Sequence, residues 1–256
     1  MNLAEVAIYI PAFNAASTLP RVFSLLPKEL RTRAGMILVV DNASTDTTSQ
    51  TSLDEAAKNN VVNFVLIRNP TNQGYGGSQK TAYKEIIKRG FSRVIMLHGD
   101  AQYSPEYALR LLCESQKQDL DLLFGSRISG DPIGGGMPLH RYLGNRLLTL
   151  IQNILLQTRI SEFHSGYRVY KTEALKKIFL SKLSSDYHFD TEIIICMVDK
   201  KMRIGEISIP TRYANEQNYV NIWGYGLSIL RSTLSYALYK KKKFKKSRWA
   251  EILPQG

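Results

Sequence analysis

The first half of the chain alternates short apolar runs with longer amphipathic runs, and this alternation limits the fold more than any other feature. The amphipathic runs have helical spacing, and Ser17 and Asp46 are expected N-caps. Strands that alternate with helices predict an α/β fold with a mostly parallel sheet that helices flank on both faces. The expected strands are 6–10, 36–40, 61–67, 93–97 and 120–124, and the expected helices are 17–26, 47–59, 78–89 and 105–118.

The second half of the chain has a looser pattern. It predicts a Gly-rich loop at 130–136, a long helix at 138–158, and a turn with a short strand at 163–170. A helix at 190–200 and a strand at 202–209 follow. No internal repeat is visible, so we expect one domain over residues 1–215, followed by an amphipathic helix and a polybasic tail over 216–256.

The net charge of +12 is unevenly spread along the chain. Seven Lys and Arg residues and one acid, Glu251, give +6 to the last eighteen residues. An aromatic and aliphatic segment at 222–239, in which Arg231 is the one charged residue, precedes them. This pattern favours contact with an anionic membrane surface, and packing on the domain or on a membrane-protein partner is the alternative. Nucleic-acid binding has no other support, and we do not expect it.

The two cysteines and the N-terminus indicate a cytoplasmic protein. Cys113 and Cys196 have no CxxC spacing, so neither a disulfide framework nor a structural zinc site is expected. The N-terminus carries an acid and no basic residue before its first apolar run, which is typical of a first strand and not of a signal peptide. No uninterrupted apolar stretch is long enough to span a bilayer.

Polar or glycine-rich segments follow four of the expected strands. They read PAFN at 11–14, DNASTD at 41–46, NQGYGG at 72–77 and HGDAQ at 98–102. Ligands of such sheets bind outside the carboxyl ends of the strands. One Asp after a strand is more often a helix cap than a ligand, but the recurrence at successive strands predicts a binding site along this edge.

These segments, in this order, resemble glycosyltransferase family 2, which has the GT-A fold. GSR at 125–127, HSGYR at 164–168 and FDTE at 189–192 extend the resemblance over residues 6–213. The branch it is most similar to is the dolichol-phosphate-mannose synthase group. The resemblance implies inverting, metal-dependent transfer of a sugar from a UDP- or GDP-sugar donor to a polyprenyl (dolichyl or undecaprenyl) phosphate. The enzyme would associate peripherally with the cytosolic face of a membrane.

The resemblance also gives roles to residues on the donor side. Asp41 matches the residue that binds the nucleotide base, and Asp100 and Gln102 match ligands of Mg²⁺ or Mn²⁺, which prefer oxygen ligands. Lys80 and Arg212 are candidates to hold the diphosphate, because Glu216 stands where relatives carry an Arg. The expected donor-binding residues are Pro11, Phe13, Asn14, Asp41, Asn72, Gly74, Lys80, Asp100, Ala101 and Arg212.

Two further departures from the family pattern concern acids. His98 stands where relatives carry the first acid of the metal motif, so it is either a third metal ligand or a buried, hydrogen-bonded histidine. A neutral imidazole would suit Mn²⁺ better than Mg²⁺. Ala15 and Ala16 replace acids that usually follow the first motif.

Arginines are the expected acceptor residues, because a planar guanidinium can hold two phosphate oxygens at once. Arg127, Arg141, Ser165 and Arg168 are the candidates, although Arg141 could be a surface residue. Arg168 could instead be structural and pair with an acid such as Glu192.

Two alternatives remain open from the sequence. With a hydroxyl acceptor on a glycan, protein or small molecule, Asp190 would be the general base, whereas a phosphate acceptor needs none. We therefore take Asp100, Arg127, Arg141 and Asp190 as the catalytic candidates. The departures at His98 and Glu216 would also fit a catalytically weakened, nucleotide-binding assembly subunit.

Overall fold

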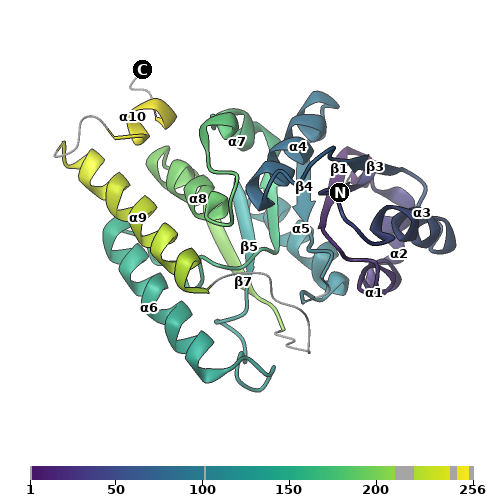
Figure 1. Ribbon diagram of the computed structural model, residues 1–256, viewed down its shortest axis with the longest axis horizontal. Helices are drawn as coiled ribbons and strands as arrows, with labels where there is room; N and C mark the ends of the chain where they lie inside the picture. The colour runs from purple at the N-terminus through teal and green to yellow at the C-terminus, as the bar shows by residue number, and fades with distance from the viewer. Residues whose placement is uncertain (1, 101, 211–221, 243–246, 254–256) are drawn as a thin grey trace.

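A seven-stranded sheet runs through the centre of the protein (Figure 1). The structure is a computed structural model, and it describes residues 2–100, 102–210, 222–242 and 247–253. Within these residues the strands are β1 Val6–Ala12, β2 Met36–Asp41, β3 Phe64–Arg68, β4 Arg93–Met96, β5 Leu122–Ser126, β6 Arg168–Lys171 and β7 Ile204–Ser208.

The strand order is β3-β2-β1-β4-β6-β5-β7. All neighbours are parallel except β6, which is antiparallel to both β4 and β5. Ala12 of β1 is paired with Asp41 of β2, and Tyr9 is paired with Met96 of β4. The carboxyl ends of β1, β2 and β4 therefore lie side by side, as the sequence predicts.

Helices cover both faces of the sheet. The described helices are α1 Leu19–Leu25, α2 Lys28–Arg33, α3 Thr48–Lys58, α4 Tyr75–Lys88, α5 Ala108–Lys117, α6 Leu139–Leu156, α7 Thr172–Lys176, α8 Phe189–Asp199, α9 Ile222–Lys240 and α10 Trp249–Ile252. Three short 3₁₀ helices lie at Leu3–Glu5, Pro105–Tyr107 and Leu180–Lys182. The mostly parallel sheet and the long expected helices are confirmed, whereas the short α2, α7 and α10 were not expected.

The side chains of β1 point alternately to the two faces of the sheet, and each face has its own apolar core. Val6, Ile8 and Ile10 face α1, α2, α3 and α5, while Ala7 and Tyr9 face the side of the sheet that carries α4, α7 and α8. Successive side chains of a strand point to opposite faces, and here both faces are buried because helices cover each of them.

Both expected N-caps lie one residue before the observed ones. The N-cap of α3 is Thr47, and Asp46, one residue earlier, accepts a hydrogen bond from the backbone N–H of Thr48 at 2.9 Å. Ser17 is wrong as a cap: α1 begins at Leu19, the residue before it is Thr18, and no side chain caps this end. The third strand begins at Phe64, three residues later than expected.

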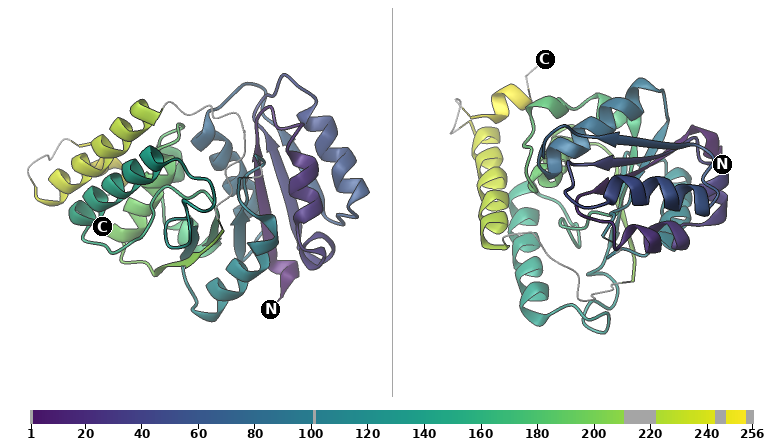
Figure 2. Two further views of the ribbon diagram at one scale, coloured as in Figure 1. Left: turned by 90° about the horizontal axis from the view of Figure 1, so that it is seen from below. Right: turned by 45° about the vertical axis from the view of Figure 1, so that its right-hand side comes forward.

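The C-terminal helices pack onto the rest of the protein. α9 lies beside α6 and against α8 (Figures 1 and 2), and α10 follows it. Trp249, 2% exposed, and Ile252, 1% exposed, belong to the same apolar core as β1 and α8. Arg248 pairs with the buried Glu192 at 2.6 Å. Glu192 is therefore the partner of Arg248, and the expected pair between Glu192 and Arg168 is wrong. In the described part of the chain, no helix combines the length and apolarity that a membrane span requires.

Two turns at the strand ends have a backbone conformation that L-residues rarely adopt. Asn14, after β1, has φ 48°, and Ala43, after β2, has φ 63°. Asn is among the residues that tolerate this left-handed region, but the Cβ of alanine clashes there with the following carbonyl at a cost of about 1–2 kcal/mol. Ala43 is thus a strained residue within the turn that follows β2.

This strain gives a direct test of the turn geometry. Ala43→Gly should raise the free energy of unfolding by about 0.5–1 kcal/mol, because relief of the strain outweighs the greater freedom of glycine in the unfolded chain. Urea unfolding at constant m-value measures the change. Ala57→Gly in the exposed part of α3 is the control and should lower stability by about 1 kcal/mol. Equal destabilisation by both changes would contradict the strain at Ala43.

Candidate active site

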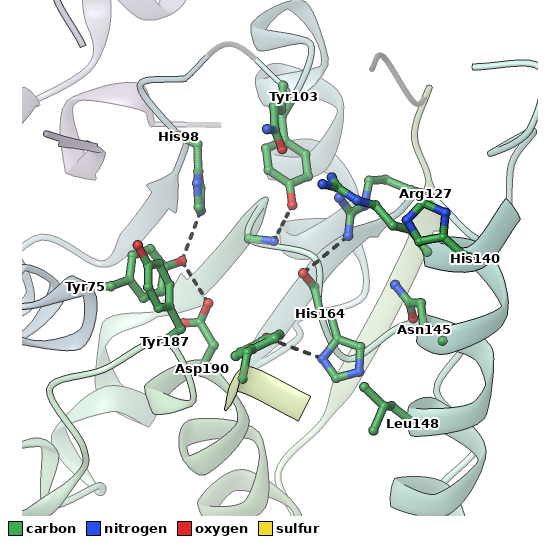
Figure 3. Close-up of a pocket in the computed structure, with 15 residues that line it drawn as sticks. Tyr75, His98, Tyr103, Arg127, His140, Asn145, Leu148, His164, Tyr187 and Asp190 are labelled. Carbon is green, nitrogen blue, oxygen red and sulfur yellow. Dashed lines mark hydrogen bonds between the residues drawn. The ribbon is translucent and has the colours of Figure 1, made fainter. Parts of the chain in front are cut away.

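Two adjoining pockets lie at the carboxyl edge of the sheet. The strand-end pocket, about 600 Å³, is formed by the turns after β1, β2 and β4 and by the start of α4. The aromatic pocket, about 340 Å³, lies between this edge and α6 (Figure 3). Tyr75, His98 and Tyr187 line both, so a wall of three side chains separates two spaces that could hold two substrates.

The strand-end pocket gathers most of the residues expected to bind the donor. Its lining includes Pro11, Phe13, Asn14, Asn72, Gly74 and Asp100. Hydrogen bonds brace its turns against one another: the backbone N–H of Asn14 donates to Ser44 Oγ at 2.9 Å, and that of Thr45 donates to Asn14 Oδ1 at 2.9 Å. Asn42 Nδ2 donates to Asn72 Oδ1 at 2.9 Å. The pocket is therefore preformed by contacts between separate strand ends.

Two expected donor residues do not reach this pocket. Asp41 is fully buried, and its carboxylate accepts hydrogen bonds from the backbone N–H of Ser44 at 2.8 Å, from Ser49 Oγ, and from Arg68 at 3.2 Å. Arg68 is the register partner of Asp41 on β3, which explains the pairing. Lys80 donates to the carbonyl oxygen of Leu183 at 2.6 Å. The structure thus gives both side chains a bracing position.

The aromatic pocket is lined mainly by rings. Tyr75 comes from α4, Tyr103 from the loop after β4, Tyr187 from the loop before α8, and Tyr225 from α9. α6 closes the opposite side with His140, Arg141, Gly144, Asn145 and Leu148. Figure 3 shows Asn145 and Leu148 facing the rings across the pocket. An apolar body with a few polar groups is the usual lining of a site for an amphiphilic ligand.

Arg127 occupies one wall of the aromatic pocket and is anchored from behind. Its backbone N–H donates to Glu162 Oε2 at 2.7 Å and its Nε donates to Oε1 at 3.0 Å. Its guanidinium also lies over the ring of Tyr103, 5.5 Å from the centroid. Burial alone would raise the pKa of Glu162. The charge and hydrogen bonds of Arg127 outweigh this effect and hold the pKa below its usual value, so the carboxylate stays ionised. This buried anion fixes the guanidinium in place.

His164 lies beside Arg127 and is a neutral group. Burial lowers its pKa to about 4, and the charges of Arg127 and Arg168 oppose protonation as well. Tyr225 Oη lies 3.4 Å from His164 Nδ1. The histidine therefore adds hydrogen-bonding capacity to the pocket and no charge above about pH 5.

Asp190 faces the aromatic pocket, but its oxygens already have protein partners. Oδ2 accepts from Tyr75 Oη at 2.9 Å, and Oδ1 accepts from Gln79 Nε2 at 2.9 Å and lies 3.4 Å from Arg168 Nη1. Tyr75 Oη also lies 3.0 Å from His98 Nε2. Both carboxylate oxygens are thus engaged with protein donors, so a substrate hydroxyl would have to displace one of these contacts to reach Asp190.

Two expected acceptor residues lie beneath the pocket and not in it. Arg168 is 1% exposed and donates to the carbonyl oxygens of Ser165 and Phe163 at 2.8 and 3.2 Å and to Tyr170 Oη at 3.0 Å. Ser165 is equally buried. Arg168 is thus structural, and its acid partner is Asp190 instead of Glu192. Arg127 and Arg141 do line the aromatic pocket.

Asp100, after β4, contributes an acidic side chain to the lining of the strand-end pocket, and Asp186 contributes another. Asp100 Oδ1 accepts from the backbone N–H of Gln102 at 3.1 Å, and Asp100 Oδ2 lies 3.8 Å from His98 Nδ1. The described residues contain no cluster of three His, Cys, Asp or Glu side chains arranged to hold a metal. A carboxylate beside an open pocket suits a divalent cation that shares its coordination with substrate phosphates.

Several lining residues have no expected role in the sequence analysis. Tyr75 and Tyr103 lie inside or next to recognised motifs, so their position beside the site could have been inferred from the sequence. Tyr187 and Tyr225 carry no local signal, because only the packing of α8 and α9 brings them to the pocket. The expected donor residues Ala101 and Arg212 lie outside the described residues.

Comparison with known proteins identifies the family. The model of glycosyl transferase family 2 matches residues 7–179. A UDP-N-acetylglucosamine–dolichyl-phosphate N-acetylglucosaminyltransferase of Methanococcus voltae is 26% identical over 223 residues, covering 82% of this chain and 88% of its own. An undecaprenyl-phosphate mannosyltransferase of Micrococcus luteus is 26% identical over 210 residues, covering 80% and 82%.

Solved structures agree on the architecture. Glucosyl-3-phosphoglycerate synthase from Mycobacterium tuberculosis, in complex with Mn²⁺, UDP and phosphoglyceric acid, matches with a TM-score of 0.64 at 13% identity. The match covers 92% of this chain and 78% of that one. The GT-A fold implied by the motifs is therefore confirmed. The family match spans more than half of the chain, and the chain belongs to glycosyl transferase family 2.

Proposed function

We propose that this glycosyltransferase moves a sugar from a nucleotide-sugar donor to a polyprenyl phosphate at a membrane surface. The relatives from Methanococcus voltae and Micrococcus luteus are named for dolichyl-phosphate and undecaprenyl-phosphate transfer. The observation that carries the proposal is the set of contacts made by Asp190. Among the described residues that line the aromatic pocket, Asp190 is the one carboxylate, and Tyr75, Gln79 and Arg168 already hold its oxygens, whereas Arg127 and Arg141 present cationic groups to an anionic acceptor.

On the donor side, the strand-end pocket would hold the nucleotide. Pro11, Phe13 and Asn14 line it together with Asn72 and Gly74. Asp100 and His98 line this pocket and would hold Mg²⁺ or Mn²⁺, whereas Gln102, the other expected metal ligand, lines the adjoining aromatic pocket. Such an ion neutralises the charge that a nucleoside diphosphate develops as it leaves. The structural neighbour from Mycobacterium tuberculosis was crystallised with Mn²⁺ and UDP, which supports this arrangement.

On the acceptor side, Arg127 and Arg141 would bind the lipid phosphate. Arg127 follows directly after β5 and Arg141 lies on α6; both line the aromatic pocket, and Glu162 holds Arg127 in a fixed orientation. A phosphate oxygen is already anionic, so the attacking atom needs orientation and not deprotonation. The rings of the pocket would cover the first apolar carbons of the lipid.

The outer face of α6 supports contact with a membrane. Leucine and isoleucine side chains repeat every three or four residues there, and each is more than half exposed: Leu139, Leu143, Leu147, Leu150 and Ile154. Leu227 and Leu234 of the neighbouring α9 are also about half exposed. Contiguous exposed apolar surface of this kind marks a binding site. We therefore place the membrane contact on α6 and α9 together.

Charge favours an anionic lipid as the partner of this face. Neither α6 nor α9 contains an acidic residue, while Arg141, Arg146, Arg231 and Lys240 lie on them. Each such cation near an anionic surface contributes about 1 kcal/mol of binding. Because α6 also lines the aromatic pocket, a lipid phosphate at this face would lie next to Arg141.

The acceptor class is tested by transfer from radiolabelled UDP- and GDP-sugars to undecaprenyl phosphate or to undecaprenol. We expect label in the organic phase with the phosphate and none with the alcohol. Asp100→Ala should abolish transfer while its thermal unfolding curve stays that of the wild type. Label on undecaprenol or on a soluble glycan would favour the hydroxyl acceptor. Tight nucleotide binding without turnover under either metal would favour an assembly subunit.

Arg141 is tested by acceptor kinetics. Arg141→Gln should raise the KM for undecaprenyl phosphate about tenfold or more, because a charge-assisted hydrogen bond is lost, and should leave the KM for the donor unchanged. Arg146→Gln, one turn further along α6 and outside the aromatic pocket, is the matched control. An equal effect of both changes would assign Arg141 to general membrane attraction.

The apolar face is tested by vesicle binding. Leu147→Ser on α6 should weaken partition into vesicles of phosphatidylglycerol mixed with phosphatidylcholine by about tenfold, since an inserted leucine contributes about 1.5–3 kcal/mol. Leu53→Ser on α3, where the leucine is 45% exposed, is the control and should have no effect. Equal partition of wild type and Leu147→Ser would contradict contact through α6.

A further inference from the structure

His98, which replaces an acid in the metal motif, is enclosed on three sides by groups that fit an imidazole. The ring centroid of Tyr75 lies 5.7 Å away and that of Tyr103 lies 5.3 Å away. On a third side is Gly166, where an added Cβ would lie 2.1 Å from His98 Nε2. Only glycine at 166 leaves room for this ring, so the surroundings are adapted to histidine at position 98.

Hydrogen bonding assigns the tautomer of this histidine. Tyr75 Oη lies between Asp190 Oδ2 at 2.9 Å and His98 Nε2 at 3.0 Å (Figure 3). The hydroxyl has one proton, which it donates to the carboxylate, because a carboxylate oxygen only accepts. The remaining bond is therefore donated by His98 Nε2–H.

The other ring nitrogen then carries a lone pair directed toward the metal motif. His98 Nδ1 lies 3.8 Å from Asp100 Oδ2, which is too far for a hydrogen bond. Two neighbouring ligands on an octahedral ion at about 2.1 Å lie about 3 Å apart. The Asp100 side chain is 41% exposed, so a small rotation would bring both atoms onto one ion.

We propose that His98 Nδ1 and Asp100 bind the divalent cation together, and that Tyr75 and Asp190 are positioning residues that hold the imidazole in its metal-binding tautomer. Histidine ligands of metals commonly donate their other N–H to such a partner, which fixes the ring and raises its basicity. A nitrogen ligand favours Mn²⁺ over Mg²⁺. This inference rests on the proposed nucleotide-sugar function, and it specifies how the donor site selects its ion.

The first experiment needs no metal. In the metal-free protein, ¹⁵N-histidine NMR should show His98 as the Nε2–H tautomer, and Tyr75→Phe should remove that preference. Tyr187→Phe is the matched control, because Tyr187 stacks on Tyr75 at 5.2 Å in the same wall and should leave the tautomer unchanged. A dominant Nδ1–H tautomer in the wild type would overturn the proposal.

The second experiment detects the ligand on the ion. Pulsed EPR of Mn²⁺ bound with UDP or GDP should show coupling to a directly bound imidazole nitrogen, and ¹⁵N-histidine labelling should change that coupling in the wild type without any substitution. The coupling should disappear in His98→Gln. Tyr75→Phe should weaken Mn²⁺ binding about tenfold or more, while Tyr187→Phe should not.

The two proposals can fail separately. Mn²⁺ bound with nucleotide but without nitrogen coupling would overturn the role of His98 and leave the transferase proposal intact. No binding of UDP or GDP with either metal would instead contradict the nucleotide-sugar function. His98→Asp provides the reverse test: we expect the ratio of Mg²⁺ to Mn²⁺ dissociation constants to fall about tenfold. An unchanged ratio would count against a nitrogen ligand.

Discussion

The buried pair of Arg168 and Asp190 joins the parts of the molecule that form both pockets. Arg168 binds the turn before β6 through two carbonyl oxygens and binds α8 through Asp190. Burial alone would lower the pKa of Arg168, but Asp190 and neighbouring tyrosines raise it, so the guanidinium stays charged. Loss of one partner from such a pair typically costs about 3–5 kcal/mol. From Asp190 the contacts continue through Tyr75 to His98, so the wall between the pockets rests on this pair.

The antiparallel strand β6 gives this wall its position. Because β6 lies between β4 and β5, the turn that precedes it lies at the same edge as the carboxyl ends of the parallel strands. Gly166 therefore meets His98, and Glu162 meets Arg127. The segments at 98–102 and 164–168 lie far apart in the sequence. They come into contact because β6 runs antiparallel in an otherwise parallel sheet.

The fold was predictable from sequence because hydrophobic period and strand-end polarity are local signals. The strand-end pocket was also predictable, since parallel strands bring their carboxyl ends together whatever the details of packing. Asp41 and Lys80 show where such reasoning stops. Both were assigned to the donor from the sequence, but Asp41 pairs with its register partner Arg68 and Lys80 binds a distant carbonyl oxygen. The exposure of the leucine face of α6 could not be predicted either. Periodicity shows that the leucines share one face of a helix, but it does not show whether another element covers that face.

The packing of α10 changes the physical meaning of the basic run near the C-terminus. The chain is packed both before this run, in α9, and after it, where Trp249 enters the core and Arg248 binds Glu192. Two charges at the ends of this run are held in place, because Lys240 pairs with Asp199 at 2.8 Å and Arg248 pairs with Glu192. A charge on a free tail attracts a surface from any direction, whereas charges held relative to the rest of the protein also favour one orientation. With the membrane contact proposed above, an anionic surface would begin to orient the protein before any leucine of α6 is buried.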